Sequence, residues 1–549
     1  MPTVNLNREE FEKLLGKKLT TEELKENISF LGTDLDNIND KEIIVEIFPD
    51  RPDLLSEAGL ARALASFIKY KPGLKHYKVL KSNYKVIIDN SVKDVRPYTA
   101  CAVVKNLKLN EIRIKEIIQL QEKLHVTYGR NRKKVAIGIY PLEKIKFPIK
   151  FLAKPSNEIK FQPLDSDKEL TADEIFEKHP AGKEYGHLLK DLNKYPLFID
   201  LNNNILSMPP IINSESAGRV TSNTKDVFIE CSGFDFRILK KCLNMIVCAL
   251  ADLGGIIYEN ELNYQGKKEI TPNLEPEEMK LNINYVNKIL GLSLNENEIK
   301  SLLERMGYNY ENKKVLVPAY RVDILHEIDL VEDVGIAYGF NNFKEKIPNI
   351  ATIGEENKFY VFKERISNLL IGYNLIEVRN YNLTNKINLN DKMNFDSNII
   401  YLANSLNQDY NCLRTWIIPS LLETLSKNKH NESPQNIFEI GTIFKRGDSE
   451  TGIVENERLA IALCHNKADF TQIRQILESL LLSLGLKYEI KEVEHASFIS
   501  GRVGRISINN KNIAYIGELN PKVLENWNLE MPVATLELNL NDLFDLIKP

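Results

Sequence analysis

The chain has 549 residues, which is too long for one hydrophobic core and favours three or four domains. With 43% hydrophobic and 27% charged residues and a mean hydropathy of −0.28, its composition is that of an ordinary globular protein. The formal net charge of −4 lacks the strong basic excess of most nucleic-acid-binding domains, although a local patch or a partner chain can supply a positive field.

The six cysteines form no C-x-x-C pair, so neither a zinc ribbon nor a disulfide framework is expected. The N-terminus is charged from Arg8 onward, which is unlike a signal peptide. No apolar run approaches the roughly 20 residues that a membrane span needs. We therefore expect a cytoplasmic protein in a reducing compartment.

The chain begins with a small α+β pattern that later recurs. A capping box at Thr20 begins a helix with an apolar stripe, and Gly32 ends it. In the second copy a capping box at Asn295 and the glycine Gly307 lie 275 residues further on. The repeated order predicts a duplicated module, against the alternative of two helices that look alike by chance.

Between the copies lies a region that mixes strands and helices. Strands are predicted at 100–104, 134–139 and 227–229, and helices at 112–124 and 237–253. The polar stretches 153–167 and 173–190 are expected to be surface segments.

After its helix, each copy reaches a short signature. It is Arg51-Pro-Asp53 in the first copy and Arg321-Val-Asp323 in the second. Only the second copy adds acids at spacings i, i+3 and i+4, which share one face of a helix. These acids are Asp329, Glu332 and Asp333, where the first copy has Gly59, Arg62 and Ala63.

Carboxylates on one helical face repel each other, and a hard divalent cation would offset that cost. Magnesium suits carboxylates and water best, whereas a single histidine, His326, gives no zinc pattern. The alternative is a solvated acidic helix start, favoured by the helix dipole. The opposite stripe is apolar and should be buried; it consists of Ile328, Val331, Val334 and Tyr338.

The last region, from Pro348 onward, predicts a mixed and largely antiparallel sheet with flanking helices. The helices are expected at 359–371, 419–428 and 471–484, and the strands at 376–381, 436–444, 502–508 and 533–538.

Three motifs in this order resemble the phenylalanyl-tRNA synthetase beta subunit family in its short archaeal and eukaryotic form. Residues 317–339, which hold the acids, resemble its B5 domain, and residues 48–63 resemble its B1 domain. Residues 206–215 resemble its B3/B4 editing domain. The resemblance implies an α+β multidomain chain with a B1-like domain at 1–85, an editing domain at 86–267, a B5 domain at 268–346 and an inactive class II synthetase-like core at 347–549.

The resemblance also implies function. The family forms an α2β2 tetramer that joins phenylalanine to tRNA(Phe) with ATP and Mg²⁺, and the alpha subunit holds the aminoacylation site with its ATP and phenylalanine. Its four B5 ligands to Mg²⁺ fall on Asp323, Asp329, Glu332 and Asp333. In the last domain, residues 437–444 and 533–538 lack the arginines that a working class II core uses for ATP. Arg414 is the nearest cation, and we expect it at a surface or interface.

The family's editing domain hydrolyses tyrosine mischarged onto tRNA(Phe), because a pocket built for phenylalanine rejects an added hydroxyl poorly. The candidates here are Ser207, Asn213, Ser214 and Glu215, with Glu215 expected to bind the tyrosyl hydroxyl. A polar loop without a catalytic role is the alternative, which would leave a non-enzymatic tRNA-binding scaffold. A more distant alternative is a stand-alone Mg²⁺-dependent phosphohydrolase that uses the four acids.

A basic cluster precedes one predicted strand of the central region. It consists of Arg130, Arg132, Lys133 and Lys134. These residues are candidates for contact with tRNA phosphates, and a solvated hairpin is an equal alternative.

Overall fold

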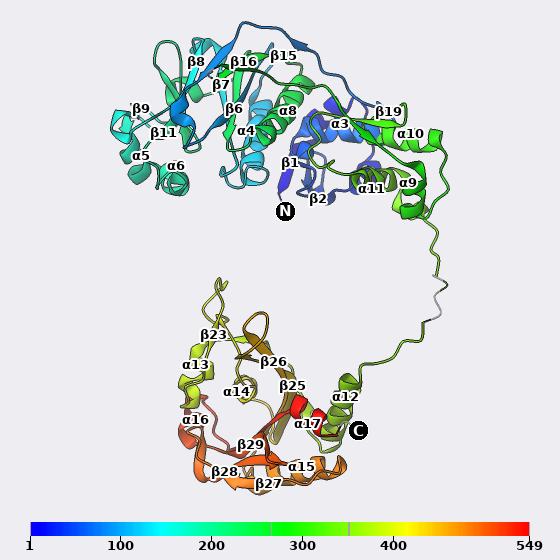
Figure 1. Ribbon diagram of the computed structural model, residues 1–549, viewed down its shortest axis with the longest axis vertical. Coiled ribbons are helices and arrows are strands. Elements are labelled where there is room, and N and C mark those ends of the chain that lie inside the picture. The colour runs from blue at the N-terminus through cyan, green and yellow to red at the C-terminus, as the bar shows by residue number, and fades with distance from the viewer. Residues whose placement is uncertain (1, 265, 348, 350–351, 548–549) are drawn as a thin grey trace. The chain divides into compact units, whose positions relative to one another are not determined.

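The computed structural model describes residues 2–264, 266–347, 349 and 352–547 (Figure 1). The chain divides into two compact units, Met1–Ile347 and Pro348–Pro549. Among the described residues no helix is both long and apolar enough to span a membrane.

The duplicated module is confirmed. The first copy has the sheet order β1-β3-β2 and the second has β18-β20-β19, so each first strand pairs with its third. The strands are β1 Thr3–Asn7, β2 Asp34–Ile38, β3 Glu42–Glu46, β18 Glu277–Lys280, β19 Asn309–Glu311 and β20 Lys314–Val317. The helices are α1 Arg8–Leu15, α2 Thr21–Phe30 and α3 Glu57–Phe67, matched by α9 Ile283–Leu290, α10 Glu296–Arg305 and α11 Glu327–Tyr338.

Local chemistry explains the shared boundaries. Reciprocal capping boxes form at Thr20 and at Asn295. Gly32 and Gly307 follow with φ of +93° and +80°, a left-handed conformation that ends a helix without the penalty of a Cβ. Helices α9 and α10 begin 275 residues after α1 and α2, and α11 begins 270 residues after α3.

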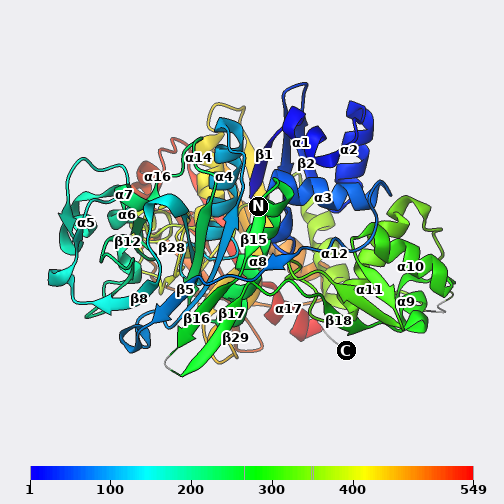
Figure 2. The same ribbon diagram turned by 90° about the horizontal axis from the view of Figure 1, so that it is seen from above.

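The central region contains two sheets, of orders β4-β15-β6-β14-β7 and β13-β12-β11-β8-β5-β16-β17. The first consists of β4 Val79–Leu80, β6 Tyr98–Lys105, β7 Val135–Pro141, β14 Val227–Gly233 and β15 Ile256–Tyr258. The second consists of β5 Lys85–Ile88, β8 Ile149–Lys154, β11 Tyr195–Ile199, β12 Ile205–Met208, β13 Ile212–Asn213, β16 Asn260–Tyr264 and β17 Lys267–Thr271. Helix α4 (Glu111–Val126) packs on β7, and α8 (Phe236–Asp252) packs on β6, β14 and β15. Helix α8 is seen beside β15 in Figure 2.

The expected surface segments 153–167 and 173–190 are mostly accessible to solvent, but they also contribute buried apolar side chains. Together with the residues between them they form strands β9 (Lys160–Phe161) and β10 (Leu170–Thr171) and helices α5 (Ala172–Lys178) and α6 (Pro180–Tyr185). Ile159, Ile175 and Leu189 are at most 2% exposed in a small core of their own. The apolar residues are too widely spaced among lysines and acids for the pattern to be visible in sequence.

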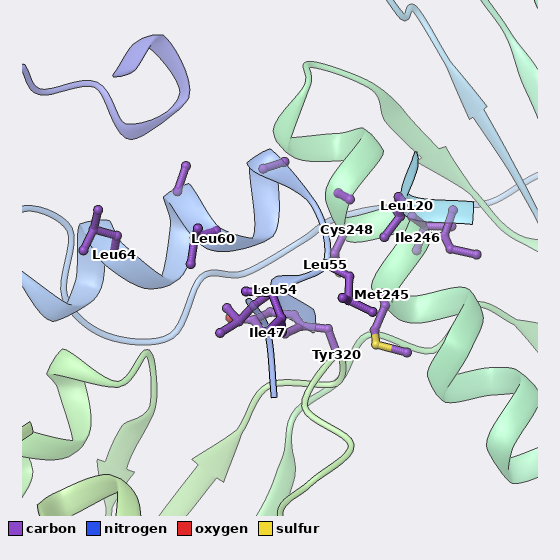
Figure 3. Packing of buried hydrophobic residues seen from close by; sticks show 14 of the residues in the cluster. Ile47, Leu54, Leu55, Leu60, Leu64, Leu120, Met245, Ile246, Cys248 and Tyr320 are labelled. Atoms are coloured by element: carbon purple, nitrogen blue, oxygen red, sulfur yellow. The ribbon is translucent and has the colours of Figure 1, made fainter. Parts of the chain in front are cut away.

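The two copies and the central region share one hydrophobic core (Figure 3). Ile47 and Leu54 of the first copy, Leu120 of α4, Met245 of α8 and Tyr320 of the second copy belong to this cluster. The copies are therefore packed parts of one unit.

The second unit is built on the seven-stranded sheet β21-β25-β26-β30-β29-β28-β27, in which only β21 pairs in parallel. Its strands are β21 Ile376–Glu377, β25 Gln435–Arg446, β26 Ile453–Cys464, β27 Glu489–Glu492, β28 Phe498–Ile508, β29 Lys511–Leu519 and β30 Val533–Asn539. One core joins the sheet to α12 (Lys358–Gly372), α15 (Phe470–Ser483) and α17 (Leu540–Ile547). A second joins it to α14 (Ile418–Lys427) and α16 (Pro521–Asn526).

A small sheet of order β22-β24-β23 and the helix α13 (Lys386–Leu389) complete this unit. The small strands are β22 Leu383–Thr384, β23 Ile400–Tyr401 and β24 Cys412–Leu413. The three predicted helices and a largely antiparallel sheet are confirmed, but β26, β27, β29 and the three strands of the small sheet were not predicted. Strands β26, β27 and β29 carry charged residues among their apolar ones, which hides the alternation.

Candidate functional site

Four polar side chains from four strands meet inside the central region. The hydroxyl of Tyr140 on β7 lies 2.8 Å from Ser207 Oγ on β12 and 3.2 Å from Glu230 Oε1 on β14. It also lies 3.4 Å from Asn213 Oδ1 on β13. Tyr140, Ser207 and Glu230 are at most 1% exposed. We call these four residues the buried polar cluster.

Glu230 is the ionisable centre of this cluster. Burial raises its pKa to about 8, although Arg96, Tyr140 and Ser232 act in the opposite direction. Its Oε2 atom is buried and has no hydrogen-bond partner within the described part of the chain. Gly138 is its partner in the β7–β14 register, and a Cβ there would lie 2.6 Å from Glu230 Oε1 and 2.1 Å from the Tyr140 hydroxyl. Glycine at this position therefore makes room for the carboxyl group.

Of the four predicted editing residues, the structure brings Ser207 and Asn213 into the cluster. Ser214 instead caps the short helix α7 (Glu215–Gly218) by accepting from Ala217 N. The Glu215 carboxylate accepts from Arg219 at 2.8 Å and from Asp165 N at 2.9 Å, and it makes no hydrogen bond to the four residues of the cluster.

Sequence reasoning missed Tyr140 and Glu230. A signal for Glu230 exists, because it is the single carboxylate in the otherwise uncharged strand Val227–Gly233. A buried carboxylate is costly unless its surroundings or its function require it.

The basic cluster forms a tight turn between α4 and β7. Arg130, Lys133 and Lys134 are exposed, as contact with phosphate requires. Arg132 is different, because its guanidinium pairs with Glu122 at 3.1 Å and donates to the carbonyl of Ile211 at 2.9 Å. The tRNA-contact assignment stays a prediction, and Arg132 is the member least available for it.

Arg321 organises two of the four predicted metal ligands. It donates to Asp323 at 2.8 Å through Nε and to Asp333 at 2.7 Å through Nη2. Tyr308 also donates to Asp333. Arg321 is buried, so these two carboxylates already have a cation in a medium of low polarity.

The other two predicted ligands, Asp329 and Glu332, are arranged differently. Asp329 accepts from the backbone N of Leu325 and of His326 at 2.8 and 2.7 Å, which caps α11. Glu332 is accessible to solvent, and partial desolvation of its carboxyl group together with the charges of Asp333, Asp50 and Asp329 raises its pKa.

Within the described ranges no three His, Cys, Asp or Glu side chains are placed to hold a metal ion. The four-ligand Mg²⁺ site therefore stays a prediction that this arrangement of side chains does not match. On the opposite stripe of α11, Val331 and Val334 are buried as expected, but Ile328 is 38% exposed.

A cavity of about 330 Å³ lies where the two copies and α8 meet. Three buried arginines line it, namely Arg51, Arg62 and Arg321, together with Asp53 and Asp252. Arg62 and Asp252 form an ion pair across it. The signature that the two copies share thus serves their packing.

In the second unit, Arg414 corrects a sequence expectation. It is 1% exposed and therefore does not lie on the surface. Its guanidinium pairs with Glu439 at 2.6 Å and donates to the carbonyl of Thr442 at 2.8 Å. Arg414 and Glu439 line a cavity of about 1140 Å³ beside β25.

Comparisons of this chain with known protein families and with known sequences agree on one family. Residues 1–70 match the Phe-tRNA synthetase beta subunit B1 domain, residues 279–340 the tRNA synthetase B5 domain, and residues 344–540 the phenylalanyl tRNA synthetase beta chain CLM domain. The phenylalanine–tRNA ligase beta subunits of Pyrococcus abyssi and Archaeoglobus fulgidus are 43% and 38% identical to this chain. Each alignment covers 99% of this chain, and 100% and 99% of those relatives.

A solved structure agrees with these relatives. The N-terminal fragment of the phenylalanyl-tRNA synthetase beta subunit from Pyrococcus horikoshii superposes with a TM-score of 0.60 at 43% identity. The match covers 61% of this chain and 99% of that fragment. The chain belongs to the phenylalanyl-tRNA synthetase beta subunit family.

Proposed function

We propose that this chain is the beta subunit of a cytoplasmic phenylalanine–tRNA ligase. With an alpha subunit, in an α2β2 tetramer, it attaches L-phenylalanine to tRNA(Phe) using ATP and Mg²⁺. The observation that carries this proposal is the similarity to named beta subunits over 99% of the chain. The buried pairing of Arg414 with Glu439 supports an aminoacylation site outside this chain, because it leaves that arginine unavailable for triphosphate.

The proposed division of labour follows four domains. They are a B1-like domain at 1–85, an editing domain at 86–267, a B5 domain at 268–346 and a non-catalytic class II-like core at 347–549. The matched duplication at both ends of Met1–Ile347 supports the first three.

We propose that the buried polar cluster hydrolyses tyrosyl-tRNA(Phe). Ser207 and Asn213 would hydrogen-bond a hydroxyl that phenylalanine lacks, which is the contact that a second sieve needs. Glu230, with its pKa raised to about 8 by burial, is suited to take a proton from water near neutral pH. Buried groups with shifted pKa values and a converging polar set are the usual signs of such a site.

The test uses the full chain co-expressed with its alpha subunit. Purified complex is given tyrosyl-tRNA(Phe), and release of tyrosine is followed beside phenylalanine charging. The proposal expects ester hydrolysis well above the uncatalysed rate. Charging without hydrolysis would instead support a non-enzymatic scaffold subunit.

The Mg²⁺ proposal concerns the outer acids of α11. Burial and the charges of neighbouring acids raise the pKa of Glu332, so a bound cation would stabilise its carboxylate form. A bound ion would relieve this repulsion and stabilise the fold near Asp329. Adding Mg²⁺ should then raise the thermal midpoint of the wild-type chain and leave that of Glu332→Gln unchanged; equal responses would reject the site.

A further inference from the structure

The turn after α4 has a strained backbone. Arg130, Asn131 and Arg132 have φ of +49°, +52° and +64°, in the left-handed region that costs an L-residue about 1–2 kcal/mol. Gly129 precedes them, and a Cβ there would lie 2.7 Å from the carbonyl oxygens of His125 and Val135. Such a conformation persists only where the surroundings over-determine it, so its contacts indicate its purpose.

Arg132 makes most of these contacts through its side chain. Besides the Ile211 carbonyl at 2.9 Å, its Nη1 lies 3.4 Å from the carbonyl of Pro210. Its guanidinium also stacks 4.1 Å from the ring of Tyr185, and Glu122 neutralises it. Pro210 and Ile211 lie in the turn between β12, which carries Ser207, and β13, which carries Asn213. One arginine from the turn between α4 and β7 thus holds the turn of the second sheet that connects the strands of Ser207 and Asn213.

A second arginine, Arg96, connects the turn that carries Arg132 to the strand that carries Glu230. Arg96 is 2% exposed and donates to Ser232 Oγ at 3.1 Å and to the Ser232 carbonyl at 2.6 Å. It also donates to the backbone carbonyl of Arg132 at 3.3 Å. Ser232 lies two residues after Glu230 on β14. Both halves of the cluster are therefore fixed to the turn that carries Arg132.

We propose that Arg132 is a positioning residue for hydrolysis, which sets Ser207 and Asn213 against Tyr140 and Glu230. The inference rests on the proposed function of the cluster. Arg132 touches none of the four residues directly and acts through the Pro210–Ile211 turn. Its exposed neighbours Arg130, Lys133 and Lys134 form no ion pair with the described residues, so they can contact phosphate. One turn therefore carries exposed basic side chains for phosphate and the Arg132 side chain that holds the Pro210–Ile211 turn.

The test measures kcat and KM for tyrosyl-tRNA(Phe) hydrolysis by the complete complex. Arg132→Met should lower kcat about 10-fold or more at unchanged KM, since displacement of a site by about 1 Å is enough for such a loss. Arg132→Lys should recover part of kcat, because an ammonium can reach one carbonyl but cannot make the forked contact. The matched control is Arg130→Met, which removes an exposed cation from the same turn and should raise KM without changing kcat.

The outcomes separate the two proposals. If Arg132→Met raises KM alone, or changes neither constant, Arg132 is not a positioning residue although the cluster still hydrolyses. If the wild-type complex does not hydrolyse the ester, both proposals fail. Should Arg132→Met fold poorly, Glu122→Gln can replace it, because it weakens the ion pair that holds the Arg132 guanidinium. This variant should lower kcat and keep the wild-type KM. A wild-type kcat in Glu122→Gln would overturn the inference.

Discussion

Arg51 and Arg321 lie at equivalent positions in the two copies of the module, and both line one cavity. Each binds the aspartate two residues later, Asp53 at 2.9 Å and Asp323 at 2.8 Å. Burial and the positive charge of Arg321 act to lower the pKa of Arg51, but Asp53 and Asp323 outweigh them and raise it. The duplicated signature has therefore become a contact between copies, in which each aspartate also compensates the arginine of the other copy.

The contact predicts a large effect for Asp53→Asn. The substitution leaves Arg51 and Arg321 buried near each other with one carboxylate fewer, and should cost about 3–5 kcal/mol of stability. Calorimetry of the full chain measures it as a lower midpoint for the transition of Met1–Ile347. Asp50→Asn is the matched control, because Asp50 is exposed in the same loop and its loss should shift the midpoint little. Equal shifts in the two variants would contradict the account.

A buried acid pair between α3 and α4 predicts a pH dependence of stability. Burial raises the pKa of Glu57 to about 7, and burial together with the charge of Glu57 raises that of Glu116 to about 8. Glu116 accepts from Ala58 N at 3.1 Å, so the side chain can stay in place when neutral. A raised pKa favours the protonated form in the folded state. The stability that it contributes is complete below about pH 4.5 and is lost as pH rises through 7 to 8.

Glu116→Gln should therefore act differently at the two ends of this range. At pH 8 and above it should raise the thermal midpoint over wild type, because the amide needs no proton to remain neutral. At pH 4 the difference should vanish. Melting curves from pH 4 to 9 measure how the difference in thermal midpoint between the two proteins changes with pH. A difference that stays constant over this range would rule out titration of this pair as its source.

The sequence predicted the scaffold better than the sites, for a physical reason. Caps, glycine stops and apolar spacing are local, so the boundaries at Thr20 and Asn295 could be predicted from a few residues each. The buried polar cluster depends on strands far apart in the chain: Tyr140, Ser207 and Glu230 meet only when two sheets pack. The pairing of charged side chains is equally non-local, since nothing in the segment around Asp329 shows that Arg321 binds Asp323 and Asp333.

Glu230 gives the sharpest test between the sequence-based and the structure-based candidates for editing. Glu230→Gln should lower tyrosyl-tRNA(Phe) hydrolysis by about 100-fold or more while phenylalanine charging is retained. Because burial raises the pKa of Glu230 to about 8, wild-type hydrolysis should rise between pH 7 and 9 as the carboxylate forms. Glu215→Gln is the comparison, and it should retain hydrolysis because that carboxylate is bound to Arg219. The reverse order of the two variants would restore Glu215 as the editing residue.

In the cavity of the second unit, Arg414 and Glu439 form an ion pair with both side chains 1% exposed. Arg414→Met leaves the Glu439 carboxylate buried without its cation, which should cost about 3–5 kcal/mol. The double variant Arg414→Met with Glu439→Gln should recover much of that loss, because neither charge then remains unpaired. Chemical denaturation of the four proteins in a double-mutant cycle measures the coupling. Additive losses would show that the two side chains stabilise the fold independently, whereas recovery in the double variant would establish that each charge is tolerated there only because of the other.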